Sequence, residues 1–442
     1  MRKLLGFLLL FVVIAAIAGV GTIYFSREQA TVPIEQTYGP TPTLAKPNPA
    51  WLPTVQVAEA TPWPEGATPT AAAGFTVQEF AGGLDHPRWL HVLPNGDVLV
   101  AESNAPPKPG EGFSVRGFFT DLFQSLAGAT VPSADRITLL RDSDSDGVAE
   151  TRSAFLTGLF SPFGMAFSDG KLYVANTDAI VAFPYQDGAT EITAPAEKVV
   201  ELPAGRNYHW TKDVIVSRDG TKLYVTVGSN SNVGENGMEE EEGRAAVHEI
   251  DLRTKQMRPF ASGLRNPNGL SWNPESGQLW VAVNERDEIG SDLVPDYMTA
   301  VKDGGFYGWP YSYYGQHVDD RPQPPRPDLV KKALVPDYAL GSHTASLGLT
   351  FNIGDLFGPD LKNGAFIGQH GSWNRIPRSG YKVVFVPFAN GRPTGPPQDI
   401  LTGFLKDDRA QGRPVGVAIA RDGSLIVADD VGNKIWRVSP SP

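Results

Sequence analysis

The sequence of 442 residues contains no cysteine, and this absence removes several kinds of chemistry at once. Disulfide frameworks, cysteine-ligated zinc, iron–sulfur clusters and thiol nucleophiles all need that residue. Any catalysis must therefore use histidine, carboxylates, lysine, arginine, hydroxyl groups or a bound cofactor. The chain also lacks an excess of positive charge, and its net charge of −11 opposes the attraction that drives nucleic-acid binding. DNA and RNA are therefore not expected partners.

Glycine and proline, by contrast, are abundant, with 47 and 38 residues. Such a composition is unusual for a helical protein and typical of one built from many short strands and tight turns. Because 41% of the residues are hydrophobic and 20% charged, the chain can bury a sizeable core, which excludes a wholly disordered or fibrous protein. An all-β fold is predicted.

The first 26 residues read as a membrane signal. Two basic residues, Arg2 and Lys3, precede an uncharged run from Leu4 to Phe25, which as a helix would reach ~33 Å and could cross a bilayer. Either a signal peptide or a single-helix anchor fits, and the length of the run favours an uncleaved anchor. The basic flank predicts that the rest of the chain is extracytoplasmic, either membrane-anchored or secreted.

Residues 27–74 differ in composition, with nine prolines interleaved with threonine and alanine. Proline fixes φ and removes hydrogen-bond donors, so this segment is predicted to be an extended linker that holds the following domain away from a membrane. The alternative is that Trp51 to Val57 packs onto the surface of that domain.

From residue 75 to the C-terminus a unit of turn, strand, turn and strand recurs. Its six copies are LPNGDVLVAES (93–103), SDGKLYVANTDAIVAFPY (168–185), SRDGTKLYVTVGSN (217–230), NPESGQLWVAVNE (273–285), NGAFIGQHGSWNR (363–375) and ARDGSLIVADDVGNKIWRVSP (420–440). Asn-Gly or Asp-Gly turns before β-branched and aromatic residues are hairpin signals. About 60 residues per copy implies blades with long loops, so a six-bladed β-propeller over residues 75–442 is predicted. Two β-sandwich domains would need a linker near the middle of the chain, and none is visible.

In a propeller the functional groups usually lie where the loops meet at the mouth of the central channel. Three histidines stand beside predicted strands: His209 in RNYHWTKDVIV, His343 in GSHTASLGLTF and His370 in IGQHGSWNR. Each suits a proton acceptor near neutral pH, and each could equally be structural. Three arginines occupy similar loops, Arg265 in SGLRNPNGLSW, Arg375 in WNRIP and Arg413 in GRPVGVAI. Converging guanidinium groups would bind a polyanionic ligand, whereas separate ones would be solvated surface residues.

The motifs RNPNGLSW, NERDEIGSDLVPDY, GGFYGWPYSYYG, HTASLGLTF, GQHGSWNR and GRPVGVAIARDGSLIVADD, in this order, resemble the glucose/sorbosone dehydrogenase family, more closely its sorbosone-type branch. The resemblance covers roughly residues 75–440. It implies a six-bladed propeller that carries pyrroloquinoline quinone (PQQ) and calcium and oxidises an aldose or sorbosone-like sugar. A respiratory cytochrome or quinone is the expected electron acceptor.

The same resemblance assigns roles to individual residues. His209 corresponds to the general base of the family. Cofactor binding is expected of seven residues: Arg265, Asn266, Asn268, Arg413, His343, His370 and Arg375, with Arg378 as an alternative to Arg375. The loop NERDEIG lacks the Gly-Pro pair whose carbonyls bind the cofactor calcium in the family and has Gly290 in place of an Asn. The carbonyls of Arg286 and Asp287 are predicted to replace that pair.

A second calcium candidate is the loop DSDSDGVAE, where Asp142, Asp144 and Asp146 alternate and Glu150 follows. Oxygen ligands at alternate loop positions can surround a hard cation. The loop is not a complete EF-hand, since its twelfth position is Ser153, and a solvated acidic turn is the alternative. Two other functions stay open for the whole chain: a calcium-dependent propeller lactonase or hydrolase, and a non-catalytic ligand-binding propeller.

Overall fold

The computed structural model describes residues 28–49, 54–107 and 122–441, and it confirms the predicted all-β class. The helices with described bounds are short. They are α3 (Pro327–Val330) and the 3-10 helices η1 (Ile34–Thr37), η2 (Met238–Glu241) and η3 (Pro359–Leu361).

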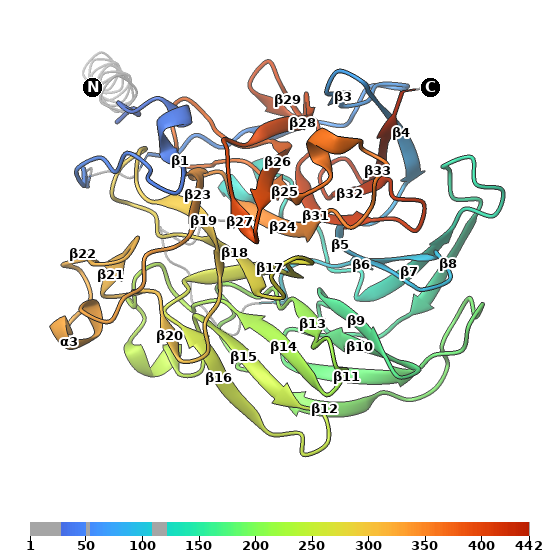
Figure 1. Cartoon of the computed structure of the whole chain (residues 1–442), viewed down its shortest axis with the longest axis horizontal. Coiled ribbons are helices and arrows are strands. Elements are labelled where there is room, and N and C mark those ends of the chain that lie inside the picture. The colour runs from blue at the N-terminus through green and yellow to red at the C-terminus, as the bar shows by residue number, and fades with distance from the viewer. Residues whose placement is uncertain (1–27, 50–53, 108–121, 442) are drawn as a thin grey trace, which may run out of the picture.

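Six sheets, each with four antiparallel strands, follow one another along the described chain (Figure 1). The first sheet contains β5 (Pro87–Val92), β6 (Val98–Glu102), β7 (Arg136–Arg141) and β8 (Thr151–Leu156). The second contains β9 (Met165–Ser168), β10 (Lys171–Ala175), β11 (Ala179–Pro184) and β12 (Glu197–Glu201). The third contains β13 (Val214–Val216), β14 (Lys222–Val227), β15 (Ala246–Asp251) and β16 (Met257–Ser262), with β20 (Gly305–Phe306) at its edge.

The remaining three sheets complete the series. The fourth contains β17 (Asn266–Trp272), β18 (Leu279–Asn284), β19 (Pro295–Ala300) and β23 (Tyr338–Ser342), with β1 (Tyr38–Gly39) at its edge. The fifth contains β24 (Ser346–Phe351), β25 (Gly364–Gln369), β26 (Lys382–Ala389) and β28 (Gln398–Thr402), with β3 (Thr70–Ala71) at its edge and β27 (Arg392–Pro393) paired to β26. The sixth contains β31 (Pro414–Ile419), β32 (Leu425–Asp429), β33 (Lys434–Pro440) and β4 (Phe75–Gly82). Two small sheets pair β2 (Glu59–Ala60) with β30 (Arg409–Ala410) and β29 (Leu405–Lys406), and β21 (Ser312–Tyr313) with β22 (His317–Val318).

Each of the six predicted repeat copies lies in a different one of these sheets. In the first copy, Asn95 Oδ1 accepts the N–H of Asp97, and Gly96 takes a φ of +100°, which gives the tight turn between β5 and β6. The second strand of each sheet is almost wholly buried on both of its faces. Such strands read as continuous apolar runs because other sheets cover both faces.

The sheets close on themselves. Their first strands contact one another in the order β5, β9, β13, β17, β24, β31 and back to β5. Strand β33 pairs along its length with β4, so the C-terminal strand and a strand from the N-terminal part share the sixth sheet (Figure 1). This arrangement leaves few long exposed edges and is consistent with a β-propeller.

The prediction that residues 27–74 form a linker standing apart from the following domain is wrong for residues 28–49 and 54–74, the part that the structure describes. The alternative, packing on the domain surface, holds for the described residues 54–57, since Gln56 and Val57 are hydrogen-bonded to Trp373 and Arg378. Strand β1 pairs with β23, β3 pairs with β28, and the indole N–H of Trp63 donates to Asp429 Oδ2 at 2.8 Å. Sheet edges offer unpaired backbone groups, and the non-proline residues of this segment use them. Residues 28–49 and 54–57 are called the strap below.

No helix in the described ranges is long and apolar enough to span a membrane. The predicted anchor over residues 1–26 lies outside those ranges.

Candidate functional site

The polar residues singled out from the sequence occur at one kind of position in the sheets. In an antiparallel pair the start of the first strand lies beside the end of the second. Arg265, His343 and Arg413 come shortly before the first strands β17, β24 and β31, and His209 comes before β13. Asp287 and His370 follow the second strands β18 and β25. The topology therefore brings these residues to one end of the sheets.

His209 is fixed by the loop that follows β14. Its Nδ1 lies 2.9 Å from the carbonyl oxygen of Ser229 and 3.1 Å from the hydroxyl oxygen of the same residue. Since a carbonyl oxygen only accepts, Nδ1 donates and Nε2 keeps its lone pair. Burial and the nearby guanidinium of Arg265 lower the pKa of His209 well below its usual value. His209 is therefore a neutral imidazole at neutral pH and can accept a proton.

Arg265 joins three loops at this site. Its Nε and Nη2 donate to the carbonyl and side-chain oxygens of Asn232 at 3.2 and 3.0 Å, and Nη1 donates to the carbonyl of Glu285 at 2.6 Å. Nη2 also lies 3.1 Å from Asp287 Oδ2. Asp287 Oδ1 in turn accepts the amide of Asn374 at 2.7 Å. These bonds hold the guanidinium and the carboxylate in one position.

The charge of Asp287 affects both neighbouring histidines. Burial alone would raise the pKa of Asp287, but Arg265 and His343 outweigh it and lower that pKa to about 2. His343 lies 3.6 Å from Asp287 through Nδ1, and its Nε2 donates to the carbonyl of Gly290 at 3.0 Å. Burial would lower the pKa of His343, but Asp287 raises it. The Arg265–Asp287 pair thus accompanies two imidazoles whose pKa values move in opposite directions, an arrangement typical of acid–base sites.

Asn266 and Asn268 lie on β17 beside His209. Asn268 Oδ1 accepts the hydroxyl of Thr211 at 3.0 Å, and its amide donates to the carbonyl of Asn266 at 3.1 Å. The side-chain oxygen of Asn266 is buried and has no hydrogen-bond partner among the described residues. Gly228 is required at this point, because a Cβ there would lie 2.4 Å from that oxygen and 2.6 Å from the Cβ of His209.

A second cluster surrounds Asp430, which follows β32. Asp430 accepts a hydrogen bond from the guanidinium of Arg88, lies 2.9 Å from Nε2 of His370, and lies 3.6 Å from Nε2 of His86. Burial would raise the pKa of Asp430, but these three groups lower it far below its usual value. Burial lowers the pKa of His86 to about 4 and also lowers that of His370. Asp430 is therefore a buried anion between an arginine and two neutral imidazoles.

Arg413 lies next to this second cluster. Its guanidinium is 5.0 Å from the ring of Tyr381, and Nη2 donates to the carbonyl of Ala58 at 3.3 Å, while Nε is buried without a partner in the described chain. The guanidinium of Arg88 lies 5.8 Å from the ring of Trp210, the neighbour of His209. These contacts connect the residues around Arg413 with the residues around His209.

The two arginines proposed for the fifth repeat contact the strap. Arg375 donates to the carbonyls of Pro377 at 2.7 Å and Val32 at 3.4 Å. Arg378 donates to the carbonyls of Gln56 and Val57. Cofactor binding by Arg375 or Arg378 stays a prediction, while both contribute to holding the strap.

The carbonyls of Arg286 and Asp287 were the predicted ligands of a cofactor calcium. The carbonyl of Asp287 accepts the side-chain amide of Asn232 at 3.1 Å, and the guanidinium of Arg286 pairs with Asp319 at 2.8 Å. The cation Arg265 also lies beside Asp287. This positive and already bonded environment does not favour a calcium ion, and the role of both carbonyls stays a prediction.

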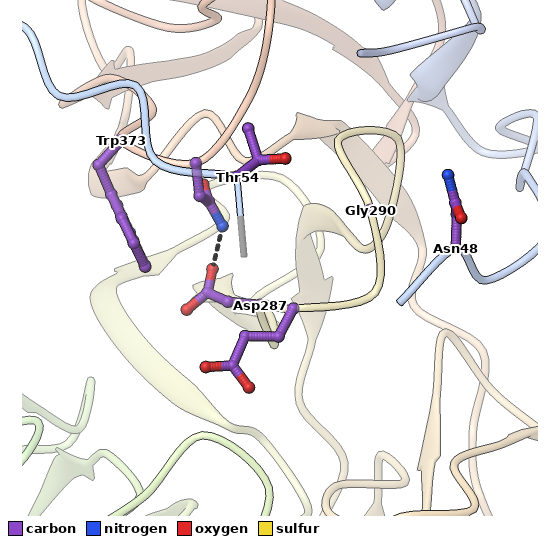
Figure 2. A pocket seen from close by; sticks show the side chains of 7 residues that line it. Asn48, Thr54, Asp287, Gly290 and Trp373 are labelled. Atoms are coloured by element: carbon purple, nitrogen blue, oxygen red, sulfur yellow. Dashed lines mark hydrogen bonds between the residues drawn. The ribbon is translucent and has the colours of Figure 1, made fainter. Parts of the chain in front are cut away.

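A small crevice opens beside Asp287 (Figure 2). It has a volume of about 20 Å³, and its walls include Asp287, Asn374, Trp373 and, from the strap, Asn48 and Thr54. The crevice thus lies between the Asp287 loop, the loop after β25 and the strap.

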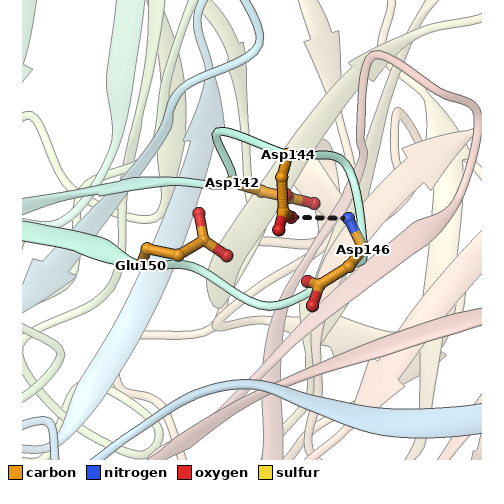
Figure 3. Close-up of side chains that lie close together, drawn as sticks. All are labelled: Asp142, Asp144, Asp146 and Glu150. Carbon is orange, nitrogen blue, oxygen red and sulfur yellow. Dashed lines mark hydrogen bonds between the residues drawn. The ribbon is translucent and has the colours of Figure 1, made fainter.

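The acidic loop Asp142–Glu150 lies on the surface between β7 and β8. The carboxylates of Asp142, Asp144, Asp146 and Glu150 have ligand atoms within 4.8 Å of one another (Figure 3). Asp142 accepts backbone N–H groups from Ser145 at 2.7 Å and Gly147 at 2.8 Å, so the turn itself aligns the acidic side chains.

Sequence reasoning missed several residues of both clusters. They are Asp430, His86, Arg88, Asn232, Asn374 and the buried Lys212, whose ammonium nitrogen lies 3.2 Å from the carbonyl oxygen of Trp210. Asn232, Asn374 and Asp430 share one usable signal, since each lies in a polar stretch that follows an apolar second strand. His86 immediately precedes β5, as Arg265 immediately precedes β17, and Arg88 is the second residue of β5.

Comparison with known proteins identifies the family. The model of the TrAA12-like family matches residues 137–302 and 330–441, more than half of the chain. The chain belongs to this family. An uncharacterized protein of Borreliella burgdorferi is 27% identical over 364 residues, which are 77% of this chain and 93% of that protein. A PQQ-dependent pyranose dehydrogenase of Coprinopsis cinerea is 24% identical over 428 residues and 83% of this chain, and the chain spans 54% of that protein's length.

A solved structure of a carbohydrate-active enzyme of family AA12 from Trichoderma reesei has the same fold as this TrAA12-like protein. Its TM-score is 0.69 at 20% sequence identity, and the match covers 89% of this chain and 100% of that one. The predicted resemblance to PQQ-dependent sugar dehydrogenases is confirmed by these family relationships, and with it the expected enzyme class, an oxidoreductase.

Proposed function

We propose that this TrAA12-like protein is a PQQ-dependent dehydrogenase of an aldose or a sorbosone-like sugar, and that its six sheets are the blades of a six-bladed β-propeller. The observation that carries the proposal is the neutral His209 beside the Arg265–Asp287 pair. A base and a fixed cation at one end of a ring of sheets match what oxidation of a hydroxyl group beside an anionic cofactor requires.

The residues at this end of the ring fit PQQ, which is flat and carries carboxylates. Arg413 Nε and Asn266 Oδ1 are buried without partners among the described residues, so each can still bond a ligand. Arg265, Asn266, Asn268 and Arg413 would hold the cofactor, with His343 and His370 on either side. When bound, PQQ supplies a quinone carbon that accepts a hydride from the sugar.

His209 would handle the proton of the same oxidation. Its Nε2 lone pair accepts the proton of the sugar hydroxyl while the C–H hydrogen leaves as hydride, so the C–OH group becomes C=O. The hydrogen bond from Nδ1 to Ser229 fixes the tautomer, and Asp287 stabilises the imidazolium that forms. Arg265 opposes that charge, which helps to keep His209 unprotonated at neutral pH.

Three further features belong to the proposal. Calcium binds the loop of Asp142, Asp144, Asp146 and Glu150, as the close approach of their carboxylates supports. The sheets form an anchored or secreted domain outside the cytoplasm, a proposal that the apolar run within residues 1–26 supports. A respiratory cytochrome or quinone then receives the electrons.

Reconstitution tests the proposal. The purified chain, loaded with PQQ and calcium, is expected to reduce an artificial redox dye when aldoses are added, and to do nothing without PQQ. Absence of dye reduction across a panel of aldoses and sorbosone would overturn it. Hydrolysis of lactones without PQQ would point to the hydrolase that the sequence left open.

A further inference from the structure

Trp373 is 40% exposed, although its neighbours Ser372 (1%), Asn374 (7%) and Arg375 (2%) are buried. A large aromatic side chain is seldom this exposed to solvent when the residues on either side of it are buried. Its ring borders the crevice beside Asp287 (Figure 2), so it lies next to the acid–base site rather than on a remote surface.

The main chain of Trp373 is fixed in place. Its carbonyl accepts the N–H of Gln56 from the strap at 2.6 Å. The next residue, Asn374, binds Asp287 at 2.7 Å. The segment that carries the indole is therefore hydrogen-bonded both to the strap and to the candidate site.

The strap itself is bound to the loop that carries Asp287. Asp292 Oδ2, which is buried, accepts the N–H and the hydroxyl of Thr31 at 2.7 and 2.8 Å, and Glu28 accepts the N–H of Ser291 at 2.8 Å. The N–H of Asn48 donates to the carbonyl of Ile289 at 2.9 Å. These four hydrogen bonds join the strap to residues 289–292.

Gly290 is the position at which this loop departs from the pattern of the family it resembles, and it lies against the strap. Its φ is +109°, and a Cβ there would lie 3.3 Å from Glu28 Oε1 and 3.4 Å from the Cβ of Asn48. A side chain at this position would be strained by the positive φ and would make tight contacts with the strap. The strap residues lie outside the segments that the family model matches, whereas Gly290 lies inside the first of them.

The size of the crevice limits what can enter it. About 20 Å³ admits one water molecule or one hydroxyl group and excludes a sugar ring. Its polar wall, made by Asp287, Asn374 and Thr54, suits a hydroxyl group. The apolar face of an aldopyranose packs well on an indole.

We propose that Trp373 and the strap form a saccharide subsite, in which a pyranose ring lies on Trp373 and inserts one hydroxyl between Thr54 and Asp287. This inference rests on the proposed function and adds the part of the protein that selects the sugar. It makes the segment after the predicted anchor a specificity element of the enzyme.

The test separates ring binding from chemistry. In the PQQ-loaded enzyme, Trp373→Ala is expected to raise KM for aldopyranoses about tenfold to a hundredfold with kcat within about twofold, because a packing contact made equally before and during the reaction is lost. Thr54→Val and Gly290→Asn should raise KM about threefold to tenfold. Ile353→Ala, which truncates an exposed side chain beyond the other end of β24, is the control and should change nothing.

A second readout does not depend on turnover. Methyl α-D-glucopyranoside, whose C1 hydroxyl is blocked, is titrated calorimetrically into wild type and Trp373→Ala, whose melting temperatures are checked first. Binding weakened about tenfold or more supports the subsite even where no dye is reduced, an outcome that would overturn only the proposed function. Turnover in wild type with unchanged KM in Trp373→Ala, or no glucoside binding by either protein, would overturn the subsite.

Discussion

Two carboxylates, Asp287 and Asp430, have similar partners and different surroundings. Each lies near histidine and arginine, and in each the pKa falls well below the usual range of an aspartate. The side chain of Asp287 is 15% exposed and borders a crevice, whereas that of Asp430 is 1% exposed. Asp430 joins groups next to β5, β25 and β32, which belong to the first, fifth and sixth sheets.

The difference in surroundings indicates that the Asp287 cluster is a functional site, whereas the Asp430 cluster, built from the same residue types, is structural. Asp430 lies where the sixth sheet, completed by β33 and β4, meets the first, so its ion pair stabilises closure of the ring. Asp287 lies on a loop held by the strap and has a neutral imidazole, His209, within its electrostatic reach. Chemistry is therefore expected at Asp287 and stability at Asp430.

The largest expected effect concerns His209. His209→Ala removes the group that accepts the hydroxyl proton, so kcat of the PQQ-loaded enzyme should fall about 10²- to 10⁴-fold with little change in melting temperature. Dye reduction under saturating sugar measures it. The exposed His317→Ala is the matched control, and a kcat for His209→Ala within tenfold of wild type would refute the assignment.

The next largest effect concerns stability, and it tests the difference between Asp430 and Asp287 directly. Asp430→Ala leaves the guanidinium of Arg88 without its anion and should lower the free energy of unfolding by about 3–5 kcal/mol. Asp287→Ala should cost about 1–3 kcal/mol, since Arg265 keeps its hydrogen bonds to Asn232 and to the carbonyl of Glu285, while turnover is largely lost. Urea unfolding measures both variants, with Asp430→Asn as the milder change if Asp430→Ala does not fold. Equal losses of stability would erase the distinction between the two clusters.

These contrasts also mark how far the sequence could predict the molecule. The hairpin signals located five of the six repeats, because the turn in each is a local Asn-Gly, Asp-Gly or Ser-Gly feature whose glycine has a positive φ. In the fifth repeat Gly364 is the first residue of β25, and a long loop that contains η3 joins β24 to β25. The motifs around His209 and Arg265 led to two side chains that do lie together. The Asp430 cluster was missed because His86, His370 and Asp430 are far apart in sequence and meet only when the ring closes. The strap was misjudged because proline-rich composition describes the free chain and not the sheet edges that bind it.

A third prediction uses pH to sharpen the same contrast. Unfolded histidine takes up a proton near pH 6.5, whereas folded His86 does so only at about 4, so between these values the unfolded state binds more protons. The free energy of unfolding should therefore fall as pH drops from ~6.5 to ~4, by about 1.4 kcal/mol per pH unit for this group. His343 has the opposite sign, since its pKa is raised: its contribution is present below pH ~6.5 and lost as pH rises through its folded pKa. Unfolding curves between pH 4.5 and 8 measure both, and His86→Gln should flatten the acid slope while His317→Gln should not.

The smallest effect lies outside both clusters, at the acidic loop. If calcium binds Asp142, Asp144, Asp146 and Glu150, chelation should lower the melting temperature by a few degrees, because an ion that binds only the folded state stabilises it. Asp144→Asn should abolish the response to chelator. Identical melting of wild type with excess calcium and with chelator would show that the loop is a solvated turn.

The central claim is that His209, Arg265 and Arg413 surround one flat anionic quinone. Titration of PQQ into the purified chain, followed by its absorbance, tests this most directly. The account predicts saturation at one PQQ per chain for wild type and His209→Ala, and affinity weakened about tenfold or more in Arg265→Met and in Arg413→Met. The absence of saturable PQQ binding to the folded wild-type chain would contradict it. So would a PQQ affinity of both arginine variants equal to that of wild type.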